Sequence, residues 1–600
     1  MRKSLLGLGI LMIGLGAPAA EWDLAAELAG ARAVFEANLD AIRNRDRDAY
    51  LNTYLESERL ARTGPAGISL GFAGLEASAG AAWPDTFEGR DLDLVPVRPG
   101  VIYGTYRYRV RYGDDEQTGL SERLFVKTDQ GWRIAVTTAF ANPPEIAPVP
   151  VAIVGGTLID GTGAAPLRDS VITIRDGLVE CAGGRDDCSL EGDYAVIDAS
   201  GRWVTPGLID AHVHYAQTGW ADGRPDSIDV TDQYPYEEAV ANLRENSEEI
   251  HRSLLCAGIT SAFDVGGYPW TVDVRDGAVG TSRVPNLAAA GPLLSTVRHE
   301  PLNLPGEKQI MPMSSPAEAR GMVRYIDSLG ADAVKVWLVI ESGVDVADLE
   351  ATVMAAGAEA AAAGLPLIVH ATELEPAKLA LRAGAKVLVH GVRDQVVDDE
   401  FLELLEANEA VYVPTLVVGR GYLRMHRSAA LDEPLEVSDP NQCVSADLLG
   451  RLLETPQLDN GLSTEQIASI DNRLSRHEKI GGMNIMRVHD AGGIVAVGTD
   501  AGNPLTLHGP SIYTELEAME KAGVRPADLL VMATRNGALA MGREDLGTVR
   551  KGNRADLLIL RADPLETLRN LEALETVILR GVSRSIEELR RKQPATEDDR

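Results

Sequence analysis

The sequence predicts an α/β protein whose largest part is a (β/α)8, or TIM, barrel, a closed ring of parallel strands with helices outside it. Short apolar strands alternate with helical segments over residues 207–545, a pattern typical of such barrels. Residues that can bind metals stand at the ends of several strands, where the active sites of these barrels lie. Strand-rich segments at 146–206 and 546–582 predict a small composite β-sandwich built from both flanks of the barrel.

The barrel strands are expected at eight places, the number that a closed barrel of this kind needs. They are 208–214, 261–265, 286–290, 333–338, 366–370, 386–390, 411–416 and 494–500. Between the fifth and the sixth strand, residues 375–383 fit a short helix that Gly384 ends. The stretch 419–481 is unusually long for a connection between barrel elements, which makes it a candidate lid over the pocket.

The flanks of the barrel share one style of short strands. Strands separated by Asp-Gly turns are expected at 151–158, 170–174, 178–181 and 195–198, and a matching pair at 555–560 and 576–580. We expect these distant segments to pair in one sheet. Residues 583–600 are charged and contain proline, so we expect a frayed tail there.

Residues 1–20 have the three parts of a secretory signal peptide: the basic pair Arg2-Lys3, an apolar stretch over 5–15 and small residues at 17–20. The apolar stretch is shorter than the roughly 20 residues that a membrane-spanning helix needs. We therefore expect a periplasmic or secreted protein with no integral membrane span.

Residues 21–145 predict a separate α+β unit. A helical stretch at 24–52 precedes expected strands at 101–111, 121–128 and 132–140. Helices followed by a curved antiparallel sheet resemble the NTF2-like (SnoaL-like) cone fold over this segment. That resemblance implies a docking or dimerisation module, and hence a homo-oligomer. Prolines between 143 and 150 predict a stiff linker after it.

The composition narrows the classes of partner. A formal net charge of −32 repels phosphate backbones and anionic membranes, so a small molecule is expected as partner rather than nucleic acid. Hydrophobic residues make up 45% of the chain, which excludes disorder as its main state. Four cysteines are too few for a disulfide framework. Cys181 and Cys188 flank a short polar turn, where a disulfide and two free thiols are equally open.

His212 and His214 stand two residues apart at the end of the first barrel strand. Side chains alternate between the faces of a strand, so both imidazoles project together while Val213 points away. Neutral imidazole is a preferred ligand of zinc. The pair therefore predicts the first ligands of a metal site.

Four further strands hold residues of matching chemistry. His370 and His390 end the fifth and sixth strands, and Asp500 ends the eighth, which lies beside the first in a closed barrel. Lys335 interrupts an apolar fourth strand, where burial and nearby cations would lower the pKa of its amine and allow it to take up carbon dioxide as a carbamate. A carbamate offers two oxygens that can bridge two metals. The alternative roles are helix capping for Asp500 and snorkelling for Lys335.

Four longer stretches carry a family pattern. They read TPGLIDAHVH at 205–214, GTDAG at 498–502, ATRNGA at 533–538 and GNRADL at 552–557. Over roughly residues 150–582 the chain resembles the amidohydrolase superfamily, in its imidazolonepropionase-like and prolidase-like branch. The resemblance implies two zinc ions as cofactors. It also implies their ligands: His212, His214 and Asp500 on one ion, His370 and His390 on the other, and a carboxylated Lys335 as the bridge.

The resemblance further implies hydrolysis of an amide bond by a hydroxide held between the metals. Asp500 would act first as general base and then as general acid, delivering the proton to the leaving amine. The expected substrate is a dipeptide such as Xaa-Pro or an N-acyl amino acid. Two alternatives stay open: the same site acting on a lactone, a cyclic amide or a phosphotriester, and a non-catalytic ligand-binding protein.

A substrate carboxylate needs a cationic or polar partner, and the loops after the barrel strands supply candidates. They are Arg224 and Tyr234 after the first strand, Arg298 and His299 after the third, and Arg420 and Tyr422 after the seventh. His299 stands where the resembling branch often has a loop histidine that faces the substrate.

Overall fold

The computed structural model describes residues 24–64, 67–80, 83–113, 115–141, 149–278, 280–341, 343–459 and 462–591. The chain divides into two compact units, Met1–Pro144 and Glu145–Arg600. The expected signal peptide and most of the proline linker lie outside the described residues. Among the helices described, none combines the length and the apolar character that crossing a bilayer requires.

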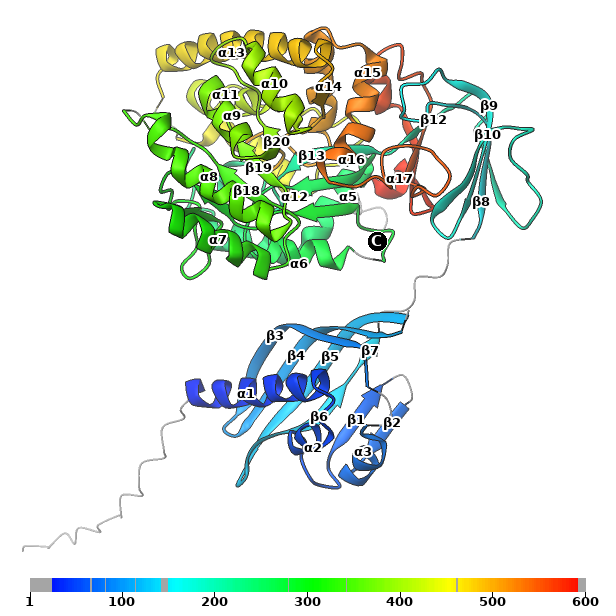
Figure 1. Ribbon diagram of the computed structural model, residues 1–600, viewed down its shortest axis with the longest axis vertical. Coiled ribbons are helices and arrows are strands. Elements are labelled where there is room, and N and C mark those ends of the chain that lie inside the picture. The colour runs from blue at the N-terminus through cyan, green and yellow to red at the C-terminus, as the bar shows by residue number, and fades with distance from the viewer. Residues whose placement is uncertain are drawn as a thin grey trace, which may run out of the picture. The chain divides into compact units, whose positions relative to one another are not determined.

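The first unit packs helices against a seven-stranded sheet (Figure 1). Its helices are α1 (Leu24–Arg43), α2 (Arg47–Asn52) and α3 (Phe72–Ser78). Its strands are β1 (Ala61–Gly64), β2 (Gly67–Leu70), β3 (Thr86–Arg98), β4 (Val101–Tyr112), β5 (Asp115–Thr128), β6 (Gly131–Thr138) and β7 (Phe140–Ala141). The sheet order is β2-β1-β6-β5-β4-β3, with β7 beside β5. Alternate residues of β4 are buried, and Tyr106 among them meets Phe35 of α1 with ring centroids 4.8 Å apart. The relation to the NTF2-like fold stays a prediction.

The second unit contains the expected composite sheet, and the pairing of its distant segments is confirmed. The sheet is eight-stranded, in the order β10-β9-β8-β12-β23-β24-β25 with β11 beside β8. The strands before the barrel are β8 (Val151–Leu158), β9 (Leu167–Arg175), β10 (Leu178–Gly184), β11 (Ala195–Asp198) and β12 (Trp203–Pro206). Those after it are β23 (Leu557–Leu560), β24 (Leu574–Leu579) and β25 (Val582–Ser585). The antiparallel pair β12–β23 joins the two groups.

Parallel strands form the barrel, as the sequence predicts (Figure 1). They are β13 (Leu208–Val213), β14 (Ile259–Asp264), β15 (Asn286–Ala289), β16 (Leu293–Ser295), β18 (Val334–Trp337), β19 (Leu367–His370), β20 (Ala385–Val389), β21 (Val411–Val413) and β22 (Ile494–Val495). The expected third strand is present as β15, which pairs with β14. After a break, the further strand β16 pairs with β18 and with an extra strand, β17 (Ile310–Pro312). The break falls at Gly291-Pro292, where Gly291 has a φ of +65° that favours glycine and Pro292 has no N–H for a ladder bond.

The expected eighth strand is shorter than 494–500, because regular pairing ends at Val495. Separate backbone bonds continue the contact with β13. Ala211 N–H donates to Val497 O at 3.0 Å, Asp500 N–H to His212 O at 2.8 Å, and His214 N–H to Ala501 O at 2.8 Å. These bonds close the ring between its first and last strands.

Helices surround the barrel. They are α4 (Tyr236–Glu245), α5 (Ser247–Cys256), α6 (Trp270–Gly277), α7 (Pro316–Ser328), α8 (Val346–Ala363), α9 (Leu374–Arg382), α10 (Asp399–Ala407), α14 (Ser511–Lys521), α15 (Pro526–Met532) and α16 (Arg535–Ala540). Local sequence explains their ends: α8, for example, begins after Asp345, whose side chain accepts from Ala347 N–H, and ends at Gly364 with a φ of +74°.

The segment expected as a long loop at 419–481 is mostly helical. It contains α11 (Val418–Leu431), α12 (Ala446–Leu453) and the start of α13 (Thr464–Asp490). A capping box between Ser463 and Gln466 begins α13. Helix α11 packs against α13, so this insertion is a folded layer rather than a free loop.

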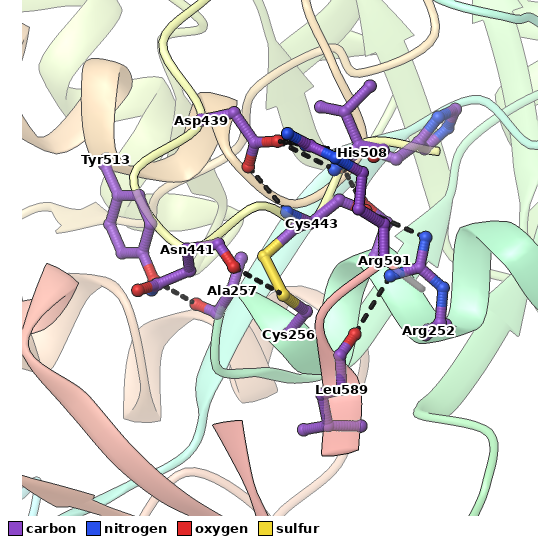
Figure 2. Close-up of a disulfide and its surroundings, with 12 residues drawn as sticks. Arg252, Cys256, Ala257, Asp439, Asn441, Cys443, His508, Tyr513, Leu589 and Arg591 are labelled. Atoms are coloured by element: carbon purple, nitrogen blue, oxygen red, sulfur yellow. Dashed lines mark hydrogen bonds and ion pairs between the residues drawn. A yellow bond between two sulfur atoms is a disulfide. The ribbon is translucent and has the colours of Figure 1, made fainter. Parts of the chain in front are cut away.

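The expectation of a frayed tail over 583–600 is wrong for its first part. Strand β25 pairs with β24, and the following helix α17 (Ile586–Leu589) buries Ile586 and Leu589. Arg591 then bonds Asp439 at 2.8 Å (Figure 2). The apolar residues between the charges anchor the segment; residues 592–600 lie outside the described residues.

Two disulfides link the four cysteines. Cys181 pairs with Cys188, so of the two alternatives for these residues the structure has the disulfide. Cys256 pairs with Cys443 across 187 residues, a pairing that the sequence did not predict. Figure 2 shows that this second bond ties the end of α5 to the segment before α12. Arg252 of α5 reinforces the junction by donating to Cys443 O at 3.0 Å and Leu589 O at 2.9 Å.

Replacing Cys256 and Cys443 together by alanine should destabilise the protein more than replacing Cys181 and Cys188 together. The loop-entropy relation gives about 5 kcal/mol for the long loop and about 2 to 3 kcal/mol for the short one. Scanning calorimetry of both double variants measures the difference as a fall in apparent Tm. Equal shifts, or no shift for the 256/443 variant, would contradict the structural role given to this bond.

Candidate metal centre

The six residues predicted as metal ligands lie at one end of the barrel. His212 belongs to β13 with His214 directly after it, Lys335 to β18 and His370 to β19, while His390 follows β20 and Asp500 follows β22. Carboxyl ends of parallel strands share one mouth of a barrel, which brings these distant positions together. The ring centroids of His370 and His390 are 4.3 Å apart, and those of His212 and His390 are 4.9 Å apart.

Lone pairs converge at the centre of this group. Nδ1 of His214 lies 2.7 Å from the carbonyl oxygen of Gly266, so in the neutral ring Nδ1 carries the proton and Nε2 the lone pair. That Nε2 atom lies 3.0 Å from Asp500 Oδ1 and 3.2 Å from Nε2 of His212. Asp500 Oδ1 is also 3.1 Å from His212 Nε2. Ligand atoms of His212, His390 and Asp500 all lie within 4.8 Å of one another.

This arrangement fits a divalent cation. Imidazole nitrogens and carboxylate oxygens are donors that zinc takes, and the separations between these atoms allow them to share one ion. Buried lone pairs that face one another are unfavourable without a cation between them. His212 and Asp500 are 0% and 5% exposed, so water contributes little screening there.

Burial sets the protonation of the nitrogen donors. It lowers the pKa of His212 to about 3 and the pKa values of His370 and His390 well below 6.5, so all three imidazoles are neutral at pH 7. Burial alone would raise the pKa of Asp500, but the neighbouring His212 and His390 hold it well below 3.8. The centre is therefore ready to bind a metal without first losing protons.

Lys335 is a buried amine with suitable chemistry for a carbamate. It is 1% exposed, and within the described part of the chain it makes no hydrogen bond or ion pair. Burial lowers the pKa of its amine to about 7, so a large fraction is neutral and nucleophilic near neutrality.

Backbone strain marks the same end of the barrel. His390, Thr415 and Asp500 have φ values of +70°, +44° and +64°, which non-glycine residues rarely adopt. Such strain persists where surrounding contacts impose it and is common at functional sites. Thr415 Oγ1 lies 2.7 Å from His390 Nδ1, which orients that ring.

Asp210 supports the centre from behind and was not predicted from the sequence. Its Oδ1 atom accepts from the backbone N–H of His212 at 3.2 Å and of Thr499 at 3.0 Å, and its Oδ2 accepts from Thr499 Oγ1 at 2.6 Å. Asp210 thus joins the strand that carries two histidines to the turn that carries Asp500. Its place two residues before His212 was the signal available in the sequence.

Some of the predicted substrate contacts form a second group close to Asp500. Arg224 bonds Asn503 Oδ1, as Tyr422 does at 2.8 Å, and the backbone of Asn503 contacts Asp500 O at 3.4 Å. Asp226, which the sequence reasoning missed, accepts from Arg224 at 2.7 Å and lies 3.2 Å from Nε2 of His299.

His299 connects this group to the metal ligands through one aromatic side chain. Its ring centroid lies 5.4 Å from that of Trp337, and Trp337 lies 6.1 Å from His370. Burial would raise the pKa of Asp226, but hydrogen bonds from Arg224 and His299 hold it well below 3.8.

The structure places three other candidates away from the centre. Arg298 is exposed and pairs with Glu300 at 3.5 Å. Arg420 joins α11 to α13 through Glu478, Asp471 and Ser475, so its donors are occupied. Tyr234 donates to Glu454 at 2.6 Å and packs against Trp220. These hydrogen-bond partners of Arg420 and Tyr234 lie at least 51 positions away in the chain, which is why the sequence did not reveal them.

Comparisons with known proteins place the second unit among relatives. A family model described as "Amidohydrolase family" matches residues 203–583. An imidazolonepropionase from Bradyrhizobium sp. is 42% identical over 65 residues, which are 10% of this chain and 16% of that protein. An enamidase from Eubacterium barkeri is 39% identical over 67 residues, which are 11% of this chain and 17% of that protein. The chain thus matches less than a fifth of the length of these curated relatives.

A solved structure shows the fold of the second unit. It is a Xaa-Pro dipeptidase with bound methionine in the active site, 23% identical, with a TM-score of 0.55. The match covers 73% of this chain and 100% of that chain.

Replacing Asp210 by alanine should weaken zinc binding by roughly 10- to 100-fold, because partners that orient metal ligands typically contribute this much. Asp210→Asn keeps one acceptor oxygen and should retain most of the affinity. Competition with a chromogenic chelator measures the constants, and circular dichroism checks the fold. Unchanged zinc affinity in a folded Asp210→Ala variant would contradict the supporting role.

Proposed function

The chain belongs to the amidohydrolase family, and we propose that it is a metal-dependent hydrolase that cleaves an amide bond in a small molecule with a carboxylate. Xaa-Pro dipeptides and N-acyl amino acids are the substrates we propose first. One observation carries the proposal: buried donor atoms of His212, His214 and Asp500 converge within hydrogen-bonding distance of one another. The similarity to a Xaa-Pro dipeptidase supports the fold on which this site stands.

Six residues would hold two divalent metals, with zinc as the proposed metal. His212, His214 and Asp500 would bind one, His370 and His390 the other, and a carboxylated Lys335 would bridge them. Such metals supply an activated water and a polarised substrate carbonyl. The lowered pKa values of His212, His370, His390 and Asp500 leave a lone pair available on each of these four side chains at neutral pH.

Asp500 is the proposed proton carrier. Its Oδ1 atom would bind the metal together with His212 and His214, which leaves Oδ2 to accept the proton that the attacking water loses. The same oxygen can then deliver this proton to the leaving amine. The strained φ of Asp500 keeps the carboxylate aimed at the centre.

The second group gives the substrate its orientation. Tyr422 and Arg224 both donate to Asn503, and Asp226 contacts Arg224 and His299, so these side chains are held in fixed positions beside the metal ligands. Positioning of this kind lowers the entropy cost of reaching the transition state.

The short similarity to imidazolonepropionase favours a second candidate, a cyclic amide. Zinc-loaded protein assayed against Xaa-Pro dipeptides, N-acyl amino acids, cyclic amides, lactones and aryl phosphotriesters separates these classes. Cleavage of the linear amides alone supports the first candidate. Cleavage of the cyclic amides alone supports the second, and absence of any turnover supports a binding protein.

Export is proposed as the setting. Two disulfides in a chain with four cysteines persist most readily in an oxidising compartment. The signal-peptide pattern at 1–20 leads to the same proposal. We propose that the first unit serves in docking or self-association, because the order of its helices and strands resembles that of NTF2-like domains.

Lys335→Ala should lose at least one metal equivalent per chain and most turnover, because the proposed bridging carbamate is removed. Acetate or propionate can supply two oxygens to the vacated space and should restore part of both. Elemental analysis and an amide-hydrolysis assay check this. A variant that keeps two equivalents and full turnover would overturn the bridging role.

Asp500→Asn should lower kcat by about 10²- to 10⁴-fold, the usual contribution of a general acid–base group. Metal content should stay close to that of the wild type, since the five other ligands remain. Asp198→Asn, at an exposed strand end, serves as the matched control. Full activity of the Asp500 variant would refute the proton-carrying role.

A further inference from the structure

A small cavity adjoins the metal centre on the side of α13. Its volume is about 30 Å³, and one water-sized group needs roughly 10–15 Å³, so two such groups fit. Barrel loops and α13 form its walls, which include His390, Arg393, Thr415, His477 and Glu478. Because His390 is both a wall of this cavity and a proposed metal ligand, a molecule in the cavity can also reach the metals.

Arg393 carries a positive charge into this cavity without an anionic partner. Its side chain is half-buried, and within the ranges that the structure describes it makes no hydrogen bond and no ion pair within 4.0 Å. Glu373 and Asp500 attract it only from farther away. A half-buried guanidinium with free donors is unusual, because such groups are normally paired.

The surroundings of Arg393 add positive charge instead of removing it. Burial lowers the pKa of Arg393, and the charge of Arg473 on α13 lowers it further. Burial lowers the pKa of His477, one turn along the same helix, and the charge of Arg393 adds to that effect. Glu478 also lines the cavity, where it pairs with Arg420 at 2.8 Å instead of with Arg393. Arg393 and Arg473 therefore place two positive charges near this cavity, in a chain whose net charge is −32.

The other arginines considered for the substrate are already neutralised. Arg224 pairs with Asp226 at 2.7 Å, Arg298 with Glu300 at 3.5 Å, and Arg420 with Asp471 and Glu478. Among these four arginines, Arg393 is therefore the one whose guanidinium N–H groups remain available to an anion.

We propose that Arg393, with His477 and Arg473 of α13 beside it, forms the subsite for the carboxylate of the substrate. A guanidinium binds a carboxylate through two parallel hydrogen bonds, and the cavity volume of about 30 Å³ leaves room for the two oxygens. The subsite selects molecules in which one carboxylate lies close to the scissile amide. It also gives the helical insertion a role, since α13 forms one wall of the specificity site. This inference rests on the proposed hydrolase function and names its substrate class.

Arg393→Gln tests the subsite, because it removes the charge and keeps a polar side chain. N-acyl amino acids and their C-terminal amides serve as paired substrates that differ in one charge. We expect KM for the carboxylate member to rise about 10- to 100-fold, the usual worth of a hydrogen bond to a charged group, with kcat within a few fold. For the amide member kcat/KM should stay unchanged, and metal content should equal that of the wild type.

Arg476→Gln is the matched control. Arg476 lies on the same helix, is exposed and is absent from the cavity wall, so the variant makes an equal change of charge without the contact. It should leave both members of each substrate pair unaffected, whereas Arg473→Gln should give a smaller KM effect than Arg393→Gln. Equal effects of Arg393→Gln on charged and neutral substrates, or equal effects of the Arg393 and Arg476 variants, would overturn the proposal.

Direct binding separates failure of this inference from failure of the proposed function. Calorimetry with N-acetylglycine as probe should detect binding to the metal-loaded wild type and a loss of at least tenfold in affinity for Arg393→Gln. If no substrate is cleaved but this difference appears, the hydrolase function fails and the anion subsite stands. If the wild type does not bind the probe, or binds it no better than the variant, the subsite is rejected.

Discussion

The hydrogen bonds that join the first barrel strand to the last determine the metal centre. Asp500 N–H donates to His212 O at 2.8 Å, and His214 N–H donates to Ala501 O at 2.8 Å. Asp210 adds a side-chain link between the same two segments. Residues almost 300 positions apart in the chain are thereby held so that their lone pairs face one common point. Without this closure, Asp500 after the last strand would lie apart from His212 and His214 on the first strand, and the three side chains could not share one metal.

Burial sets the protonation states of the side chains that converge at this centre. Desolvation keeps His212, His370 and His390 neutral and lowers the pKa of Lys335 to about 7, while Asp500 stays ionised. A buried carboxylate surrounded by neutral donors needs a cation to offset the desolvation of its charge. The strongly acidic protein therefore has a centre suited to a cation, and Arg393 beside it is the proposed partner for an anion.

Periodicity and strand position predicted much of the fold and of the ligand set. The alternation of a strand placed His212 and His214 on one face, and the strand ends at His370, His390 and Asp500 follow from the barrel topology. The break after the third strand coincides with the pair Gly291-Pro292 in the sequence. The pairing of β15 with β14 and of β16 with β18 depends on distant segments and could not be predicted from that pair.

Partners that are distant in the sequence account for most of the differences. Arg420 was predicted as a substrate contact, but in the structure it forms ion pairs with Asp471 and Glu478 of α13. The Cys256–Cys443 disulfide spans 187 residues, and no local pattern identifies such a pair. The prediction of a frayed tail was wrong for its first part. The many charged residues there favoured solvent exposure, whereas Ile586 and Leu589 between them are buried.

The location of bound metal tests the central claim most directly. Anomalous diffraction at the zinc edge, on crystals of zinc-loaded protein, should show two peaks about 3.5–4 Å apart, the usual spacing in two-metal sites, at the barrel end between His212, His370 and Asp500. Peaks elsewhere, or no peak between these side chains in protein soaked with excess zinc, would contradict the account.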